Sequence, residues 1–432
     1  MEMVKFYGSL GRHGKFLWRY PDLSTILLEV SGTSFPDTKI QGEGGNNPSD
    51  VVIDITVGEG NEMYVDFADG TGEHTFLPNS TRGTKILYSA TALHYFQDVP
   101  ENIKNTYNTS YDIKRVIKIR FKDPSKVTYF KMHHIGVHGN FPKALGTYNI
   151  TQDIDISSNN SKKWDSAPTA LKGLRVKYLR LSTAFKEQFE RIPDWIINSE
   201  IKEISLVSSF NARQKLPNET AMDKIHLIKG LYSLNFVSVG LGNNSFADNL
   251  KSTLLYNVFL QHNQFSVVPE AIYNALQIEY LTLGSGYLEN WGTGFKSGSK
   301  LNRLGYSPSS NVNFTTEVPK GLENCILIKT IENLGSYRTQ ARLDAHINAW
   351  YDFIVLNASI SAGNTKFRQM SINMGYTANT TATGINTRPS GLYQDSVNPS
   401  TPMEKIYKMV KVYGHTWTVV NTTGTGNQVL TP

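Results

Sequence analysis

One hydrophobic pattern recurs along the middle of the chain: an apolar residue, two residues of any type, an apolar residue, one more residue and a third apolar residue. Alternation with period two predicts a short strand that has one buried face. Successive copies lie about 23–25 residues apart, with one longer step before Phe236, so we expect one strand per repeat. The apolar positions are Val127/Phe130/Met132, Ile154/Ile156, Val176/Leu179/Leu181, Ile201/Ile204/Leu206, Leu231/Leu234/Phe236, Leu255/Val258/Leu260, Ile278/Leu281/Leu283 and Leu301/Leu304/Tyr306.

The segments that precede some of these strands also share a pattern. An apolar residue, a proline, two further residues and another apolar residue occur at Pro193, Pro269 and Pro319. Proline is favoured in the first turn of a helix, where its missing N–H costs nothing. We therefore predict a short helical turn on the path from one strand to the next.

The fullest copy is LLYNVFLQHNQF, in which Leu255, Val258, Leu260, Asn263 and Phe265 fit L-x-x-L-x-L-x-x-N-x-L. Through this motif and its spacing, the stretch from about 127 to 334 resembles the leucine-rich repeat family. The resemblance implies an α/β repeat, namely a leucine-rich-repeat solenoid of about 25-residue coils with parallel strands and helical return segments. The consensus asparagine is kept only at Asn159 and Asn263, so we expect an irregular solenoid.

Shorter signals divide the rest of the chain. Period-two alternation on both sides of Gly58-Glu59-Gly60-Asn61 predicts a hairpin. Residues Asp66 to Thr71 weakly resemble the turn of PKD-type β-sandwich modules; Asp66 and Asp69 suit either a calcium ion or an Asx turn.

We interpret VPENIKN, 99–105, with the strand pattern at 112–121 as a capping coil of the repeats. The expected organisation is an N-terminal arm or attachment segment (1–50), a small β-domain with that capping coil (51–124), the solenoid (125–335) and a helical and mixed C-terminal cap (336–432).

In the cap, apolar residues at helical spacing through Leu343, Ile347, Trp350 and Ile354 predict a helix that closes the end of the solenoid. Strands are expected around Ile372 and over 415–420, and a helix from about Pro402 to Gly414. This tail resembles the C-terminal segment of leucine-rich repeat proteins encoded by Bacteroidetes bacteria and their tailed phages. The resemblance implies a surface or virion appendage component.

Composition and charge exclude several classes of protein. The net charge of +6 comes from basic residues scattered along the chain, which disfavours nucleic acid as a partner. The single cysteine, Cys325, excludes an intramolecular disulfide framework. The N-terminus lacks an apolar signal-peptide core and no run of about 18 apolar residues occurs, so we expect no membrane insertion. These features suit synthesis in the cytoplasm, a mature fragment, or a component released by lysis.

Candidate catalytic chemistry is sparse. His133, His134 and His138 form the densest titratable cluster, but the strand pattern places Met132 in a strand and His138 in the following turn, so no zinc-binding helix face results. Glycoside hydrolysis needs two carboxylates about 5–10 Å apart, for which Asp153, Asp155 and Glu203 are the candidates. No hydrolase elbow, phosphate loop or zinc motif occurs. We expect a protein that is not an enzyme and that has no cofactor and no resident metal.

The apolar positions are expected to form core, so a ligand would meet the strand residues that face outward. Tyrosine together with amide, carboxylate and guanidinium groups suits a glycan or a protein surface. The alternative is a solvated sheet face without a ligand. The candidate ligand-binding residues are Tyr129, Lys131, Asp153, Asp155, Tyr178, Arg180, Glu203, Asn235, Asn257, Phe259, Tyr280 and Arg303; Ser205, Ser233, Thr282 and Gly305 complete the same two columns.

The leading functional hypothesis is a structural and binding protein of a tailed-phage virion, such as a tail or head fibre or a tail-associated appendage for host attachment. Its expected partners are other virion proteins, a host cell-surface glycan or protein, and copies of itself in a homo-oligomer. One alternative is a bacterial cell-surface adhesin or glycan-binding module. A second alternative is a carbohydrate-active enzyme.

Overall fold

The chain forms two compact units, one comprising Met1–Ile150 with Asn160–Leu174 and the other Thr151–Asn159 with Arg175–Pro432. They are described separately. The structure, a computed structural model, describes residues 25–31, 50–54, 61–66, 73–76, 85–89, 114–127, 130–134, 137–138, 140, 142, 144–145, 148, 150, 153–158, 164–166, 177–182, 185–187, 192, 194–197, 199–207, 222–247, 250–251, 253–285, 288–308, 316–333, 340–360, 370–374, 388–420 and 427–432.

Unit 1 contains an antiparallel sheet in the order β4-β3-β6-β1-β8. Its strands are β1 (Ile26–Ser31), β3 (Met63–Asp66), β4 (Glu73–Phe76), β6 (Lys114–Phe121) and β8 (Val137–His138). Alternate side chains of the three central strands point into one core, and Ile26, Leu28, Met63, Val65, Ile117 and Ile119 are all fully buried. One buried face and one exposed face is the arrangement expected of an antiparallel sheet.

Unit 1 also contains β2 (Asp50–Asp54), β5 (Lys85–Ser89), β7 (Phe130–His134) and β10 (Trp164–Ser166). The hairpin predicted around residues 58–61 is wrong, because β2 pairs with β5 and β7 whereas β3 pairs with β4 and β6. The alternation identified strands, but it carried no information about which strand each one pairs with.

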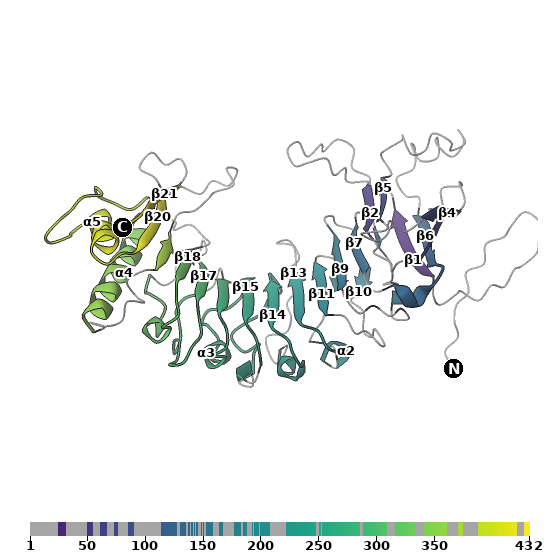
Figure 1. Ribbon diagram of the computed structural model, residues 1–432, viewed down its shortest axis with the longest axis horizontal. Helices are drawn as coiled ribbons and strands as arrows, with labels where there is room; N and C mark the ends of the chain where they lie inside the picture. The colour runs from purple at the N-terminus through teal and green to yellow at the C-terminus, as the bar shows by residue number, and fades with distance from the viewer. Residues whose placement is uncertain are drawn as a thin grey trace, which may run out of the picture. The chain divides into compact units, whose positions relative to one another are not determined.

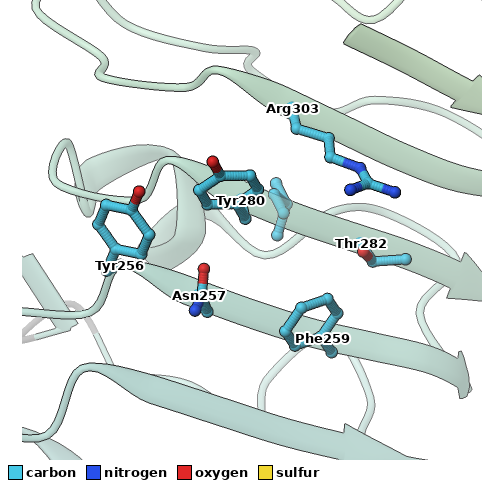
Figure 2. A pocket seen from close by; sticks show the side chains of 7 residues that line it. Tyr256, Asn257, Phe259, Tyr280, Thr282 and Arg303 are labelled. Carbon is cyan, nitrogen blue, oxygen red and sulfur yellow. The ribbon is translucent and has the colours of Figure 1, made fainter.

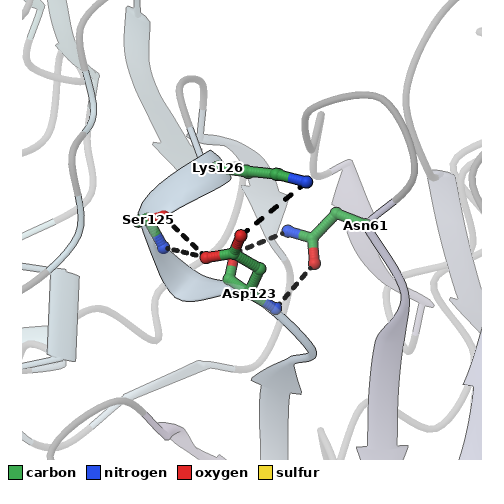
Figure 3. A network of polar contacts seen from close by, with 4 residues as sticks. All are labelled: Asn61, Asp123, Ser125 and Lys126. Carbon is green, nitrogen blue, oxygen red and sulfur yellow. Dashed lines mark hydrogen bonds and ion pairs between the residues drawn. The ribbon is translucent and has the colours of Figure 1, made fainter.

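Hydrogen bonds of the Asn61 side chain connect the start of β3 to the end of β6, as Figure 3 shows. Its Nδ2 donates to the carbonyl of Asp123 at 2.9 Å, and its Oδ1 accepts from the Asp123 N–H at 2.9 Å. The Asp123 carboxylate caps the short 3-10 helix η2 (Pro124–Lys126) by accepting from the Ser125 N–H and hydroxyl. Asn61 is fully buried, so this pairing satisfies polar groups that would otherwise be costly.

Three further expectations fall in unit 1. The strand pattern at 112–121 does not belong to a capping coil, because β6 lies between β1 and β3 in the antiparallel sheet; residues 99–105 lie outside the described residues. His138 is in strand β8, opposite Glu29, rather than in a turn. Asp66 ends β3 with a carboxylate oxygen 3.5 Å from Lys118 Nζ, and Asp69 lies outside the described residues.

Unit 2 contributes eleven strands to one sheet, in the order β21-β20-β19-β18-β17-β16-β15-β14-β13-β11-β9 (Figure 1). All neighbouring pairs are parallel except β20 with β21. The strands are β9 (Asp153–Ser158), β11 (Tyr178–Ser182), β13 (Glu203–Val207), β14 (Ser233–Val237), β15 (Asn257–Asn263), β16 (Tyr280–Ser285), β17 (Arg303–Pro308), β18 (Thr330–Asn333), β19 (Ser371–Asn373), β20 (Thr416–Val420) and β21 (Asn427–Leu430); β12 (Phe185–Glu187) lies beside them in sequence.

Backbone hydrogen bonds hold the parallel strands in one register. The carbonyl of Tyr232 accepts from the N–H groups of Tyr256 and Asn257, at 2.8 and 3.0 Å. The carbonyl of Tyr256 accepts in the same way from Glu279 and Tyr280, both at 3.0 Å. Lys177, Lys202, Glu279 and Asn302 repeat this geometry, so one carbonyl just before each strand fixes where the next strand begins.

This register aligns the apolar positions into columns, so the strand positions predicted from the sequence are confirmed here. Ile154, Leu179, Ile204, Leu234, Val258, Leu281 and Leu304 are paired in sequence across neighbouring strands, and each is at most 1% exposed. Each strand alone would expose these side chains, so the neighbouring strands supply the apolar environment.

The α/β-repeat class, and with it the leucine-rich-repeat solenoid, is wrong for this chain. The described residues are dominated by strands. In the described parts of the return segments between β9 and β18, the α-helices are α2 (Asp194–Ile197) and α3 (Glu270–Asn274), of only four and five residues. The 3-10 turns η4 (Ile225–Leu227) and η6 (Leu322–Asn324) are shorter still. The described return segments therefore reverse the chain through short turns instead of a helical layer.

Asn263 shows how the irregular end of β15 is stabilised. His262 has a left-handed φ of 58°, and the strand register shifts between Gln261 and Asn263. The fully buried Asn263 side chain then donates to the carbonyls of Phe236 at 2.7 Å and Leu260 at 3.0 Å, and accepts from the Leu241 N–H at 3.1 Å. It therefore replaces ladder hydrogen bonds that the bulge removes.

The two long helices of unit 2 lie near its C-terminal end (Figure 1). The 21-residue helix α4 (Gln340–Ile360) connects β18 to β19, and the ten-residue helix α5 (Pro402–Lys411) lies between β19 and β20. The predicted helices and the strands at 371–373 and 416–420 are confirmed. The expectation that α4 closes the end is wrong, because β19, β20 and β21 continue the same sheet beyond it.

Helix α4 is anchored to the sheet by a buried aromatic cluster. His346 Nδ1 donates to the Thr316 carbonyl at 2.6 Å, which leaves Nε2 to accept from the Tyr306 hydroxyl at 2.7 Å and from Trp350 Nε1 at 3.1 Å. The Tyr306 ring packs edge-on against Trp291, with centroids 5.4 Å apart. Burial lowers the pKa of His346 to about 4, against the opposing effect of its bond to Thr316.

We predict that replacing Asn263 by alanine lowers the free energy of unfolding by about 3 kcal/mol. The change removes the Asn263 hydrogen bonds to two buried backbone carbonyls and one buried N–H, and a buried polar group left unsatisfied costs about 1–3 kcal/mol. Chemical denaturation of the purified chain measures the difference. Asn243→Ala is the matched control, because the Asn243 side chain also accepts hydrogen bonds from backbone N–H groups, those of Ser266 and Val267. Asn243 is exposed, so water can take the place of its side chain. The free energy of unfolding should therefore fall by less than about 1 kcal/mol. Equal losses for both variants would contradict the role given to burial.

We further predict that His346 makes the protein less stable in acid. Its folded-state pKa of about 4 lies below the ordinary 6.5, so the unfolded chain binds a proton that the folded chain does not. Stability therefore falls as pH drops through 6.5 and levels off below about 4, by up to about 3 kcal/mol for this group. In urea unfolding across this range, His346→Gln should show a shallower pH dependence than the native chain. Parallel pH profiles would show that His346 is not responsible.

Candidate functional site

The structure arranges the predicted ligand-binding residues in two columns across the outward face of the unit 2 sheet. Tyr178, Glu203, Asn257, Tyr280 and Arg303 stand at the first position of their strands, and Asp155, Arg180, Asn235 and Phe259 two positions further on. Backbone pairing places Asp153 beside Tyr178 and Lys131 opposite Asp54 in unit 1. Tyr129 lies outside the described residues. The predicted residues of unit 2 therefore do share one face of a sheet, whereas Lys131 belongs to unit 1.

Small residues in these columns are more buried than an outward position suggests. Ser205, Ser233 and Thr282 are 7%, 5% and 9% exposed, because larger neighbours on adjacent strands cover them. Asn235 is half-buried, and its Oδ1 has no hydrogen-bond partner among the residues that the structure describes. Accessible chemistry on this face therefore comes from its aromatic and charged side chains.

Charged side chains gather at the β9 side of the face. Arg180 in β11 lies between two carboxylates, with Nη1 3.8 Å from Asp155 Oδ2 and Nε 3.2 Å from Glu203 Oε1. The guanidinium therefore occupies the space in which the sugar oxygen and water of a glycosidase would react. This arrangement forms an ion-pair network across three strands, and Arg180 itself is 42% exposed, so water weakens each pair.

Further along the sheet, the outward face holds a hollow of about 370 Å³. Figure 2 shows Tyr256 and Tyr280 near the start of their strands and Phe259 and Thr282 further along. The hollow is lined by Tyr256, Asn257, Phe259, Tyr280, Leu281, Thr282 and Arg303. Four of these seven were candidates from the sequence, and the structure brings them together in one place. The volume falls within the range of about 300–1,000 Å³ typical of small-ligand sites.

Two tyrosines form one wall of the hollow. The ring centroids of Tyr256 and Tyr280 are 5.2 Å apart, with planes tilted by 46°. A hydrogen bond with Tyr280 raises the pKa of Tyr256 to about 12, with smaller contributions from burial and from the charge of Glu279. The Tyr256 phenol is therefore a neutral hydrogen-bonding group near pH 7. Tyr256 was missed from the sequence because it precedes the strand; the recurrence of tyrosine at this position in Tyr232 was the available signal.

The opposite wall carries an ion pair. Arg303 Nη2 lies 2.7 Å from Glu332 Oε2 on the neighbouring strand β18. Between the walls, Thr282 is paired in register with Phe259 on one side and Gly305 on the other. Gly305 adds no side chain to the second outward column between Thr282 and Glu332.

Comparison with known proteins found no family model that matches the chain and no curated protein that matches it. Among the helices within the described parts of the chain, none is long and apolar enough to cross a membrane. No group of three or more His, Cys, Asp or Glu suited to holding a metal ion occurs within the described ranges. The geometry of the face therefore provides the functional argument.

We predict that Tyr280→Phe lowers the pKa of Tyr256 from about 12 toward the ordinary tyrosine value of about 10. The substitution removes the hydroxyl whose hydrogen bond makes the largest contribution to the shift. Carbon NMR of tyrosine labelled at Cζ, assigned with a Tyr256→Phe variant, measures this titration. An unchanged Tyr256 pKa would show that the two hydroxyls do not interact.

Proposed function

We propose that this protein is a non-enzymatic binding protein that presents the outward face of its unit 2 sheet to a ligand at a bacterial cell surface. The observation that carries the proposal is the hollow between Phe259, Tyr280 and Arg303, where rings, an amide and hydroxyl groups surround a depression of about 370 Å³. Binding sites combine apolar and aromatic walls with a few oriented polar groups in this way.

Catalysis is the weaker alternative on the same face. The candidate acids Asp155 and Glu203 each form an ion pair with Arg180, whose guanidinium lies between them. A glycosidase instead needs one carboxyl group free to donate a proton and room for a sugar ring between the two. The residues that line the hollow include neither carboxylate.

We propose a tailed-phage virion appendage, such as a fibre or a tail-associated subunit, as the setting. The support for this setting is the resemblance of the C-terminal segment to proteins of Bacteroidetes and their phages. The alternative, a bacterial cell-surface adhesin, would use the same face to bind its ligand. The two settings therefore differ in where the protein is located, on a virion or on a cell, and not in the proposed binding site.

Replacing Phe259 and Tyr280 together by alanine should weaken binding of the fluorescently labelled chain to intact Bacteroidetes cells at least about ten-fold, equivalent to about 1.4 kcal/mol. Flow cytometry over a panel of strains measures this binding. Tyr178→Ala is the matched control, because Tyr178 lies on the same face outside the residues that line the hollow. Circular dichroism verifies folding of all variants. Native-like cell binding by the folded double variant would overturn the proposed site.

Mass spectrometry and immunogold labelling of purified virions test the setting. A virion component is expected at constant stoichiometry in the particles. Absence from particles, together with labelling of the bacterial envelope, would replace the phage setting with the cell-surface alternative and leave the binding face untouched.

A further inference from the structure

We propose that the ligand of the hollow is a neutral carbohydrate, whose ring packs against Phe259 and the Tyr256–Tyr280 pair. This inference deepens the proposed function and rests on it. It concerns the chemical class of the ligand, which follows from the aromatic walls, the polar groups and the charges around the hollow.

The aromatic side chains provide apolar faces in a polar setting. Phe259 projects from the outward column of β15 and is only half-buried, although its neighbours Asn235 and Thr282 on the same column are polar. Tyr256 is 36% exposed. Partly exposed rings lose water favourably when an apolar surface covers them, and the C–H groups on one face of a sugar ring are such a surface.

The polar groups of the hollow match hydroxyl ligands. The Asn257 amide offers both donors and an acceptor, and the phenols of Tyr256 and Tyr280 each offer one donor and an acceptor. They come from Tyr256, just before β15, from Asn257 at its first position and from Tyr280 on the adjacent strand β16 (Figure 2). A ligand that presents C–H groups on one side and hydroxyl groups at its edge satisfies both sets together.

The charges argue against an acidic ligand. Arg303 is the only cationic side chain among the residues that line the hollow, and its guanidinium is bound at 2.7 Å to Glu332, which is 22% exposed. An acidic sugar would have to displace this carboxylate or approach it closely. At the other side of the face, Arg180 is likewise shared by Asp155 and Glu203. The hollow therefore offers hydrogen bonds and rings without unpaired positive charge among its described residues.

The test uses the full chain and two sets of probes: neutral oligosaccharides of glucose, mannose and galactose, and acidic oligosaccharides of galacturonate and glucuronate. Binding is measured on a glycan array and then by titration calorimetry. At least one neutral oligosaccharide should bind, and raising NaCl from about 0.05 to 0.5 M should change its affinity less than about two-fold, because no charge on the ligand is screened.

Variants separate the aromatic from the charged contribution. Phe259→Ala should weaken binding of the neutral sugar by about ten-fold or more, whereas Arg303→Gln should weaken it less than about three-fold. Arg180→Gln is the matched control for removing a guanidinium from the same face outside the hollow. Thermal unfolding of each variant verifies that it is folded.

The outcomes distinguish this inference from the proposed function. Salt-sensitive binding of an acidic oligosaccharide that Arg303→Gln abolishes would overturn the inference and keep the binding site. Absence of carbohydrate binding, with cell binding that still depends on Phe259 and Tyr280, would also overturn it and indicate a protein ligand. Carbohydrate binding that neither ring affects would overturn both the inference and the proposed site.

Discussion

The structure of unit 2 depends on a carbonyl that accepts two hydrogen bonds from the next strand, repeated at Lys177, Lys202, Tyr232, Tyr256, Glu279 and Asn302. This contact fixes the position at which each strand begins, and therefore its register. Because side chains alternate between the two faces of a strand, a shift of one residue would exchange the core column with the outward column. The burial of Leu234, Val258 and Leu281 and the outward, half-buried position of Phe259 and Tyr280 thus have the same cause.

The hollow is a local variation in the side chains on the outward face of this regular sheet. Neighbouring strands place side chains at fixed separations of about 4.8 Å, so surface relief comes from differences in side-chain size along a column. Phe259, Thr282 and Gly305 decrease in size across three adjacent strands, and Arg303 on the last of these strands forms an ion pair with Glu332. A rigid array of this kind holds its rings without a large loss of conformational freedom when a ligand binds, which favours affinity from a shallow site.

The C-terminal helices and the return segments differ in how they contact the unit 2 sheet. The short turns α2 and α3 only reverse the chain, whereas α4 contributes His346 and Trp350 to a buried cluster with Tyr306. That cluster stays neutral because burial lowers the pKa of His346, so its three hydrogen bonds are compatible with an apolar surrounding. Unit 1 obtains the equivalent fastening from Asn61 and Asp123, with amide and backbone groups in place of rings.

The sequence by itself determined the position and phase of the parallel strands, since the apolar pattern at residues such as Leu255, Val258 and Leu260 reflects burial that every strand needs. It also determined helices α4 and α5, whose periodicity is long enough to be unambiguous. Tertiary structure decided which strands pair: β2 pairs with β5 and β7 instead of β3, and β19 to β21 extend the sheet past α4. The described parts of the return segments hold only the short helices α2 and α3. It also decided that Tyr256 joins Tyr280 and that Arg180 and Arg303 are engaged by carboxylates. Periodicity encodes which side of a strand is buried, but contacts between residues far apart in sequence exist only after the strands have been placed side by side.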